Sequence, residues 1–294
     1  MWATIGSGPS EFHRPPSAIC LAVSNLFWCS VKPSRFISSC GASRPLSRCP
    51  RRGPGGARPK ALLEIDAEPW VIKFSDGDRA DAPLIEHATL TLARGAFIRT
   101  ATSIAVRLTD GHAIAVKRFD RSSGQRRHCL SAAVALRAAA EPFGYPELAQ
   151  LLRRKGVAQG ERYVKDMQEL FRRMVFNILM DNTDDYEKSH ALIVSADQQY
   201  ELSAAYDVLP TGQALGFQQM RIGHQGADST LENALSMSNL FALKPDAAVT
   251  EARRVARVVN GWKAHFRACG VSAADIERYA EQIDRPFLRE QRDA

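Results

Sequence analysis

The stretch Asn182-Thr183-Asp184-Asp185-Tyr186-Glu187-Lys188-Ser189-His190 places three carboxylates, a lysine and a histidine between two apolar segments. Before it, residues 161–180 carry apolar side chains at i, i+3 and i+4 spacing, which predicts a long amphipathic helix. After it, residues 191–194 predict a short buried strand. Loops held between rigid elements often carry catalytic groups, so this loop is the first candidate site. A solvated charged turn is the alternative interpretation.

Strands dominate the sequence upstream of this loop, and helices dominate beside and after it. A turn containing Pro69 is expected between the first two strands, and Asp110-Gly111 predicts a tight hairpin. Periodicity predicts strands at 61–66, 70–74, 104–108, 113–119, 191–194 and 200–202, and helices at 84–97, 131–140, 147–155, 161–180, 247–269 and 272–283. This order predicts an α+β fold, with a small β-rich lobe, a mainly helical lobe and a cleft between them.

The first 54 residues differ in composition from the rest of the chain. They hold seven basic side chains and one acidic one, so most of the net charge of +7 lies there. They also hold four of the six cysteines, at spacings that match no C-x2-4-C zinc pair. One short apolar run, Ala18–Trp28, could be the centre of a signal peptide, but Ser24 and Asn25 interrupt it. We interpret residues 1–54 as a disordered or non-native extension.

Composition excludes several classes of protein. Apolar residues make up 45% and charged residues 24%, values typical of globular chains and not of wholesale disorder. No stretch approaches the ~18 uninterrupted apolar residues of a membrane helix. The near-neutral body argues against phosphate-backbone binding, so a nucleic-acid-binding function would rest on the first 54 residues. Cys129 and Cys269 stand alone in the body, which is typical of a reducing compartment and predicts a cytoplasmic protein.

Three further clusters could carry chemistry. Gly55-Gly56 directly precedes a strand and would let backbone N–H groups approach a phosphate, although a flexible turn is the alternative. Lys73 lies in an apolar strand and needs a partner, which Glu86 on the following helix could supply; a solvated strand-end lysine is the alternative. Asp207 follows Asp184 by 23 positions across two strands, the spacing between the catalytic and metal-binding aspartates of protein kinases.

Five motifs in this order resemble HipA-like serine/threonine kinases, the toxin kinases of bacterial toxin–antitoxin pairs. They are GGARPKALL at Gly55–Leu63, WVIKF at Trp70–Phe74, RFDR at Arg118–Arg121, NTDD at Asn182–Asp185 and AYDVLP at Ala205–Pro210. The resemblance extends from about Gly53 to the C-terminus. It implies a two-lobed protein-kinase-like fold, with a β-rich nucleotide-binding lobe at 55–122 and a helical lobe with the catalytic and metal-binding loops at 123–294. Many relatives carry a further N-terminal subdomain, so a truncated or mis-started copy is one expectation.

The resemblance also implies a role for each matching residue. Asp184 would be the catalytic base, and Asp207 with Ser189 would bind Mg²⁺. Residues 55–60 would form the phosphate loop, and residues 117–119 the hinge around adenine. The full set expected around ATP is Gly55, Gly56, Ala57, Arg58, Lys60, Lys73, Glu86, Lys117, Arg118, Phe119, Tyr186, Lys188 and Tyr206.

Two residues depart from the family's usual catalytic loop, D-x-H-x-K-N. Ser189 replaces the asparagine that helps to hold magnesium, and a hydroxyl is shorter than an amide. Tyr186 replaces the histidine and cannot become a cation near pH 7. An active kinase, a weakened kinase and a degenerate pseudokinase that binds nucleotide and an antitoxin all stay open.

The resemblance implies partners as well as chemistry. It implies a growth-inhibiting enzyme that uses ATP and Mg²⁺ to phosphorylate a cellular protein, and aminoacyl-tRNA synthetases are targets in the family. It also implies a DNA-binding antitoxin partner. The body itself is expected to bind neither nucleic acid nor a membrane.

Overall fold

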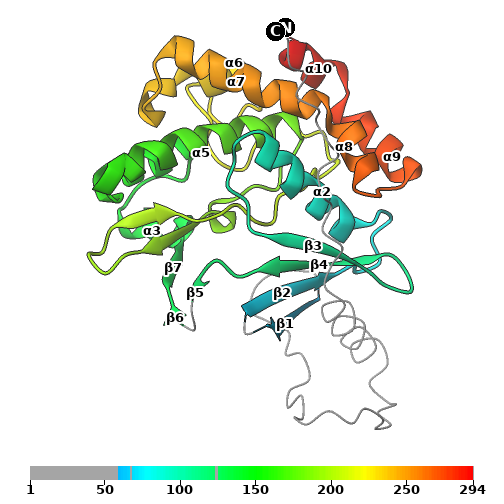
Figure 1. Cartoon of the computed structure of the whole chain (residues 1–294). Helices are drawn as coiled ribbons and strands as arrows, with labels where there is room; N and C mark the ends of the chain where they lie inside the picture. The colour runs from blue at the N-terminus through cyan, green and yellow to red at the C-terminus, as the bar shows by residue number, and fades with distance from the viewer. Residues whose placement is uncertain (1–58, 67, 123–124, 294) are drawn as a thin grey trace, which may run out of the picture.

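The computed structural model describes residues 59–66, 68–122 and 125–293, and the expected extension 1–54 lies outside them. The N-terminal part is an antiparallel sheet in the order β1-β2-β4-β3, with α2 (Ala82–Gly95) packed on one face (Figure 1). Its strands are β1 (Lys60–Ile65), β2 (Glu68–Phe74), β3 (Ser103–Arg107) and β4 (His112–Lys117). The hairpin predicted from Asp110-Gly111 is confirmed by the β3–β4 pairing, and Gly111 supplies the positive φ of the turn, 67°.

A mainly helical part follows, interrupted by two small sheets. One is the hairpin β5–β6 (Arg121–Ser122 and Gln125–Arg126), and the other joins β7 (His128–Ser131), β8 (Ala191–Val194) and β9 (Tyr200–Leu202). The helices are α3 (Ala132–Ala138), α4 (Tyr145–Lys155), α5 (Arg162–Leu179), α6 (Leu231–Ser236), α7 (Pro245–Asn260), α8 (Trp262–Ala268), α9 (Ala273–Ile283) and α10 (Pro286–Asp293), with short 3-10 turns at Gln159–Glu161, Glu187–Ser189 and Ser238–Phe241. The expected order of a β-rich part followed by a helical part is confirmed.

Two local expectations are wrong, and several short elements were not expected. Pro69 lies inside β2, opposite Glu64, and not in a turn. A proline near the start of a strand costs no ladder bond when its N–H is not needed there, and the Pro69 carbonyl still accepts from Arg118 N at 3.0 Å. The single helix expected at 247–269 is two helices, because the chain turns at Gly261 between α7 and α8. The short elements β5, β6, β7, α6 and α10 were not expected.

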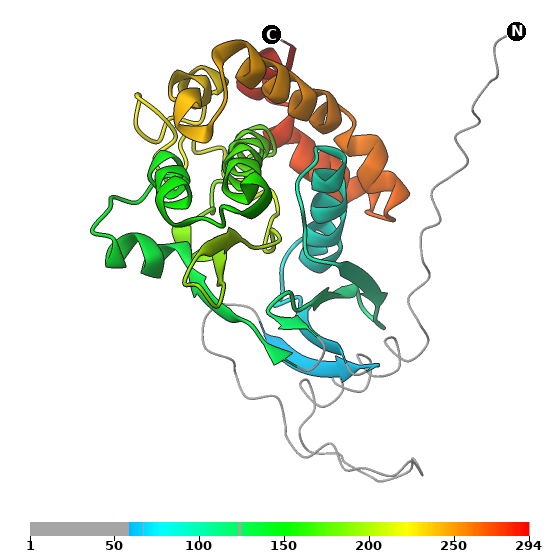
Figure 2. The ribbon, with the colours of Figure 1, turned by 60° about the vertical axis from the view of Figure 1, so that its left-hand side comes forward.

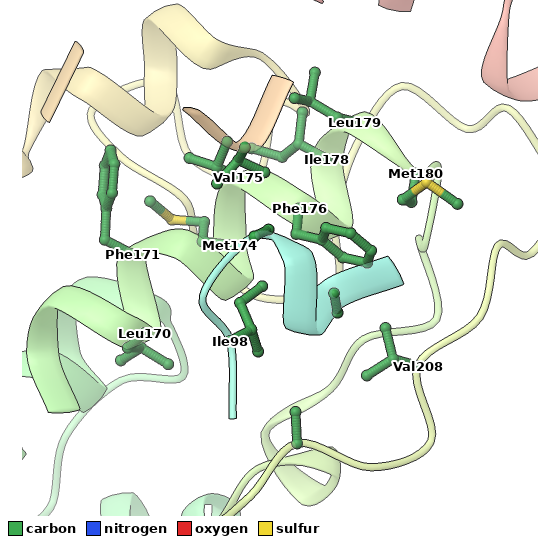
Figure 3. Packing of buried hydrophobic residues seen from close by; sticks show 14 of the residues in the cluster. Ile98, Leu170, Phe171, Met174, Val175, Phe176, Ile178, Leu179, Met180 and Val208 are labelled. Carbon is green, nitrogen blue, oxygen red and sulfur yellow. The ribbon is translucent and has the colours of Figure 1, made fainter. Parts of the chain in front are cut away.

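The amphipathic segment predicted before the charged loop is α5, and it forms the centre of the core. Phe171, Met174, Val175 and Ile178 are fully buried on it. Figure 3 shows these side chains from α5, with Ile98 from the chain after α2 and Val208 from the loop after β9 packed near them. The same cluster includes residues of α2 and of α7, so α2 packs both on the sheet and on the helical part (Figure 2). The helix that carries Glu86 is therefore fixed from both sides.

The Phe171→Ala variant tests this central packing. Truncating a fully buried phenylalanine removes its contacts and leaves a cavity, so the free energy of unfolding should fall by about 3–5 kcal/mol. The matched control is Phe143→Ala, because Phe143 is exposed and its loss should cost less than about 1 kcal/mol. Urea unfolding followed by circular dichroism measures both, and equal losses would contradict the assignment of α5 as the centre of the core.

Candidate functional site

Lys73 joins three elements that are far apart in the sequence. It lies on β2, and its Nζ is 2.6 Å from Glu86 Oε1 on α2 and 2.8 Å from Asp207 Oδ1 in the loop after β9. The side chains of Lys73 and Glu86 are buried, whereas that of Asp207 is 47% exposed. The pairing of Lys73 with Glu86 was expected, and the structure adds Asp207 to it. One ammonium and two carboxylates therefore meet at the edge of solvent, an arrangement that suits a phosphate ligand bound together with a divalent cation.

The charge state of Lys73 follows from its neighbours. Burial by itself lowers the pKa of this amine, because desolvation disfavours the charged form. The attraction of Glu86 and Asp207 and the hydrogen bonds to them raise it, and the net pKa lies above the ordinary value. Lys73 therefore stays a cation at neutral pH.

Asp207 is held in an uncommon backbone conformation. Its φ is 58°, in the left-handed region, where a residue with a side chain is strained. The preceding segment is anchored by backbone bonds from Ala205 N to Arg99 O (2.8 Å) and from Ser203 N to Ala191 O (2.9 Å). The guanidinium of Arg173 on α5 donates to Ser203 O at 2.6 Å. These contacts fix the direction in which the chain reaches Asp207.

The two neighbouring aspartates of the charged loop lie in opposite environments. Asp184 is exposed, and Asp185 is buried. The Asp185 Oδ2 accepts a hydrogen bond from the Tyr145 hydroxyl and lies 3.0 Å from His190 Nε2. Asn177 continues the network, because its amide nitrogen lies 3.0 Å from the Tyr145 hydroxyl oxygen. The loop is thus anchored through Asp185, and this anchoring leaves Asp184 at the surface.

Tyr145 and His190 were not among the expected site residues. Burial and the nearby Asp185 carboxylate raise the pKa of Tyr145 well above its ordinary value, so the hydroxyl keeps its proton and donates. The close spacing of Asp185 and His190 in the sequence was a signal for part of this network. Tyr145, at the start of α4, is separated from the loop by a whole helix and gave none.

Tyr206 links the expected hinge to the charged loop. Its ring lies 5.4 Å from that of Phe119, and its hydroxyl donates to Lys188 O at 3.3 Å. Ser189 and Tyr206 also line one small cavity together with Asp185 and His190. The Lys188 ammonium lies 4.4 Å from the centre of the Tyr186 ring. Four of the expected residues, Tyr186, Lys188, Ser189 and Tyr206, are therefore close neighbours.

Lys117 and Arg118, expected at the hinge, are engaged by protein groups. Lys117 Nζ lies 3.1 Å from Glu68, and the Arg118 guanidinium binds Asp120 at 2.8 and 2.6 Å. Their backbone N–H groups donate to Thr102 O (2.8 Å) and Pro69 O (3.0 Å). Phe119, the third residue expected at the hinge, contacts Tyr206 through its ring.

The pairing of β1 with β2 places three residues on the same face of the sheet as Lys73. Lys60 lies directly opposite Lys73 in the β1–β2 register, and Leu62 lies opposite Val71, so all four point to the same face. Leu62 is 68% exposed, which is unusual for a leucine in a sheet. Leu62 and Val71 were not expected as site residues. Gly55, Gly56, Ala57 and Arg58 lie outside the described residues.

The residues near Lys73 suit a hard cation better than a soft one. No group of three or more His, Cys, Asp and Glu side chains in the described part of the chain is arranged to hold a metal by itself. Mg²⁺ is commonly held by one or two carboxylates with phosphate oxygens completing the site. The half-exposed Asp207 carboxylate is a donor of that kind, and Ser189 would add a hydroxyl oxygen. The donor set fits Mg²⁺ bound together with a phosphate ligand.

Comparison with known proteins places the chain in a family. The model of the HipA-like C-terminal domain matches residues 53–263. A structure from Shewanella oneidensis, a complex of the toxin–antitoxin proteins HipA and HipB with operator DNA, is similar at a TM-score of 0.62 and 17% identity, over 98% of this chain and 76% of that one. The Helicobacter pylori proinflammatory kinase CtkA is similar at a TM-score of 0.58 and 10% identity, over 83% of this chain and 93% of that one. No curated protein matches the sequence significantly.

These similarities confirm the expected α+β, kinase-like fold. Among the described helices, none has the length and apolar character that crossing a membrane requires.

The titration of His87, on the helix that carries Glu86, should make the protein less stable at acid pH. His87 on α2 contacts Ser103 on β3 (Nδ1 to Oγ, 3.0 Å), and burial, with a smaller electrostatic contribution from the basic side chains nearby, lowers its pKa to about 4. The pKa of His87 in the unfolded chain is about 6.5, so between pH 6.5 and pH 4 the unfolded chain binds a proton at this residue more readily than the folded chain does. The free energy of unfolding therefore decreases by up to about 3 kcal/mol as the pH is lowered through this window.

Thermal unfolding from pH 7 to pH 4 measures this loss. The His87→Gln variant removes the titrating group and should lose less stability over the same window than the unmodified chain. The control is His128→Gln, at an exposed residue of β7. If His87→Gln and His128→Gln follow the same pH curve, His87 is not the group responsible.

Proposed function

The chain belongs to the HipA-like C-terminal domain family, and on that premise we propose that it is an ATP- and Mg²⁺-dependent protein serine/threonine kinase. The observation that carries the proposal is the contact of Lys73 with both Glu86 and Asp207. A strand lysine paired with a helix carboxylate is the arrangement that protein kinases use to hold nucleotide phosphates. The additional contact with Asp207 brings a candidate metal ligand to the same point.

Each polar residue of the cleft has a proposed role. Asp184 accepts the proton of a substrate serine or threonine hydroxyl as its oxygen forms a bond to the γ-phosphorus of ATP. The bond from that phosphorus to the bridging oxygen breaks, and ADP leaves. Asp207 and Ser189 would hold Mg²⁺, which when bound supplies positive charge next to the transferred phosphoryl group. Lys73, which contacts Asp207, would supply a second positive charge to the phosphates.

Asp184 is exposed, whereas the other two acidic residues of its loop, Asp185 and Glu187, are buried. A catalytic base must reach a hydroxyl on another protein, and Asp184 is the exposed member of the aspartate pair. Asp185 is buried against Tyr145 and His190, and it would position the loop without touching substrate. The contacts of Asp185 with Tyr145 and His190 would also offset part of the cost of placing two carboxylates next to each other.

The nucleotide is proposed to lie between the sheet and the charged loop. Lys60 and Lys73 would face its phosphates, together with the expected loop residues Gly55, Gly56, Ala57 and Arg58. The adenine would lie against Phe119 and Tyr206 on one side and the exposed Leu62 on the other. Lys117 and Arg118 would support the hinge through Glu68 and Asp120 and would not contact the base directly.

The proposed biological setting follows the family. The similar Shewanella oneidensis structure contains HipA with HipB and operator DNA, which supports a DNA-binding antitoxin as the partner of this chain. A growth-inhibiting cytoplasmic kinase that acts on a cellular protein, such as an aminoacyl-tRNA synthetase, is the corresponding proposal for its action.

Phosphoryl transfer tests the proposed function directly. The full chain, incubated with a bacterial lysate, Mg²⁺ and γ-labelled ATP, should label at least one protein on serine or threonine. The Asp184→Asn variant should lower the rate by about 10²–10⁴-fold, because it loses the base, while calorimetry should still detect ATP binding. The control is Asp197→Asn, an exposed turn residue between β8 and β9 that should leave labelling unchanged. Equal labelling by Asp184→Asn and the unmodified chain would refute the role of Asp184.

A pseudokinase is the second candidate, and Ser189 favours it. This residue stands where the family usually has a magnesium-binding asparagine, and it sits in the short turn Glu187–Ser189 beside Tyr206. A hydroxyl reaches less far than an amide oxygen, so magnesium would be held less tightly. A chain that binds nucleotide but transfers no phosphate would fit this second function.

The Ser189→Asn variant separates the two candidates. Restoring an amide oxygen should lower the Mg²⁺ concentration for half-maximal transfer several-fold, or start transfer where the unmodified chain shows none. Ser195→Asn, in the turn after β8, is the matched control and should change neither quantity. An unchanged Mg²⁺ dependence in Ser189→Asn would exclude residue 189 as a ligand.

A further inference from the structure

The four-stranded sheet has two apolar faces, and side chains alternate between them along each strand. Ile114 and Val116 of β4 point toward α2 and belong to the main core. The residues that alternate with them form a second, separate cluster. We call this cluster the outer face, and its principal members are Trp70, Ile72, Phe74, Val106, Ala113 and Ala115.

The outer face is buried, although no described element covers it. Ile72, Val106, Ala113 and Ala115 have no exposed surface, and Trp70 has 7%. Every described member of the cluster comes from the strands of this sheet or from the β3–β4 turn. In both ribbon views the coloured helices lie on the α2 side (Figure 1, Figure 2). A sheet cannot seal its own face, so another part of the chain must pack there.

The length and the end point of the undescribed chain identify which part this is. Within residues 1–294, the undescribed stretches are 1–58, 67, 123–124 and 294, and only the first is long enough to cover four strands. It ends at Pro59, whose carbonyl accepts from Phe74 N at 3.1 Å, so it leaves the sheet at β1 itself. Four strands span only about 15 Å, well within its reach.

One segment of this stretch has the composition to cover an apolar face. The run Ala18–Trp28 is the apolar part of the first 54 residues. Within it, Ile19, Val23, Leu26 and Phe27 recur at i, i+4, i+7 and i+8, the spacing of a one-sided apolar stripe. The remainder is rich in proline, serine and arginine and offers no comparable surface.

We propose that the segment Ala18–Trp28 of this chain packs on the outer face of the sheet. The segment would then be part of the folded unit, in contrast to the expectation that residues 1–54 are a disordered or non-native extension. The proposal does not depend on the kinase function, because it concerns the face opposite Lys73. Ile72 and Phe74, the neighbours of Lys73 on β2, would be among the residues that the segment covers.

Hydrogen exchange on the full, unmodified chain is the first test. Amides of residues 18–28 should exchange more slowly than those of residues 1–14 and 36–54, because a packed segment is protected. Light scattering on the same sample should report a monomer. Equal exchange across residues 1–54 overturns the proposal. So does a dimer in which β2 and β4 become protected only at high protein concentration, because a second copy would then be the cover.

A matched pair of double variants is the second test. Leu26→Asp/Phe27→Asp places two charges in the proposed contact, whereas Phe36→Asp/Ile37→Asp makes the same change to an apolar pair outside it. The first should lower the Tm by at least about 5 °C and raise the fluorescence of a dye that binds exposed apolar surface. The second should leave both unchanged. Equal Tm values for the two double variants would overturn the proposal. If the first variant fails to fold, the hydrogen-exchange experiment on the unmodified chain still tests the proposal.

Discussion

The site depends on one buried cation, the ammonium of Lys73. Removing a charge from water costs several kcal/mol, and only closely placed opposite charges offset that cost. Here Glu86 lies at 2.6 Å and Asp207 at 2.8 Å, so β2, α2 and the loop after β9 must be positioned together. Glu86 is buried on α2, which packs on the sheet and on α7 and α8. Asp207 is half exposed, so of the two carboxylates it is the one that a cation from solvent can reach.

A second set of charges, buried except for Arg99, holds the segment before Asp207. Arg173 on α5 bonds to Glu169 on the same helix and to the carbonyl of Ser203, while Arg99 reaches Asp166 at 2.8 Å and Glu169 at 2.5 Å. Burial raises the pKa of Glu169, but the two arginines outweigh that effect and the net pKa lies below its ordinary value. These ions fix the segment from Leu202 to Ala205 without entering the cleft. The strain at Asp207 can persist because the residues before it have little freedom.

Features set by neighbouring residues could be predicted from the sequence, whereas contacts between distant residues could not. The Asp110-Gly111 hairpin, the stripe of α5 and the strand at 191–194 follow from neighbouring residues, and the structure contains each of them. Pro69 was expected in a turn because proline usually interrupts a strand. In the structure it lies at the start of β2, opposite Glu64 of the edge strand β1, where no ladder bond needs its missing N–H. Tyr145 could not have been predicted as a partner of Asp185, since only the packing of α4 against α5 brings the two together. The contact of Lys73 with Asp207 likewise arises from the fold and from no sequence spacing.

The alternation of β2 connects the site with the stability of the whole sheet. Val71 and Lys73 point to the face on which α2 packs, while Trp70, Ile72 and Phe74 point to the outer face, so β2 contributes to both faces. Any loss of cover from the outer face would let water reach Ile72 and Phe74 and would weaken the strand on either side of Lys73. The ammonium would then lose the fixed backbone that keeps it within hydrogen-bond distance of Glu86, because a buried ion pair tolerates little displacement. Whatever covers the outer face therefore acts on the cleft through β2, although it touches none of the charged residues.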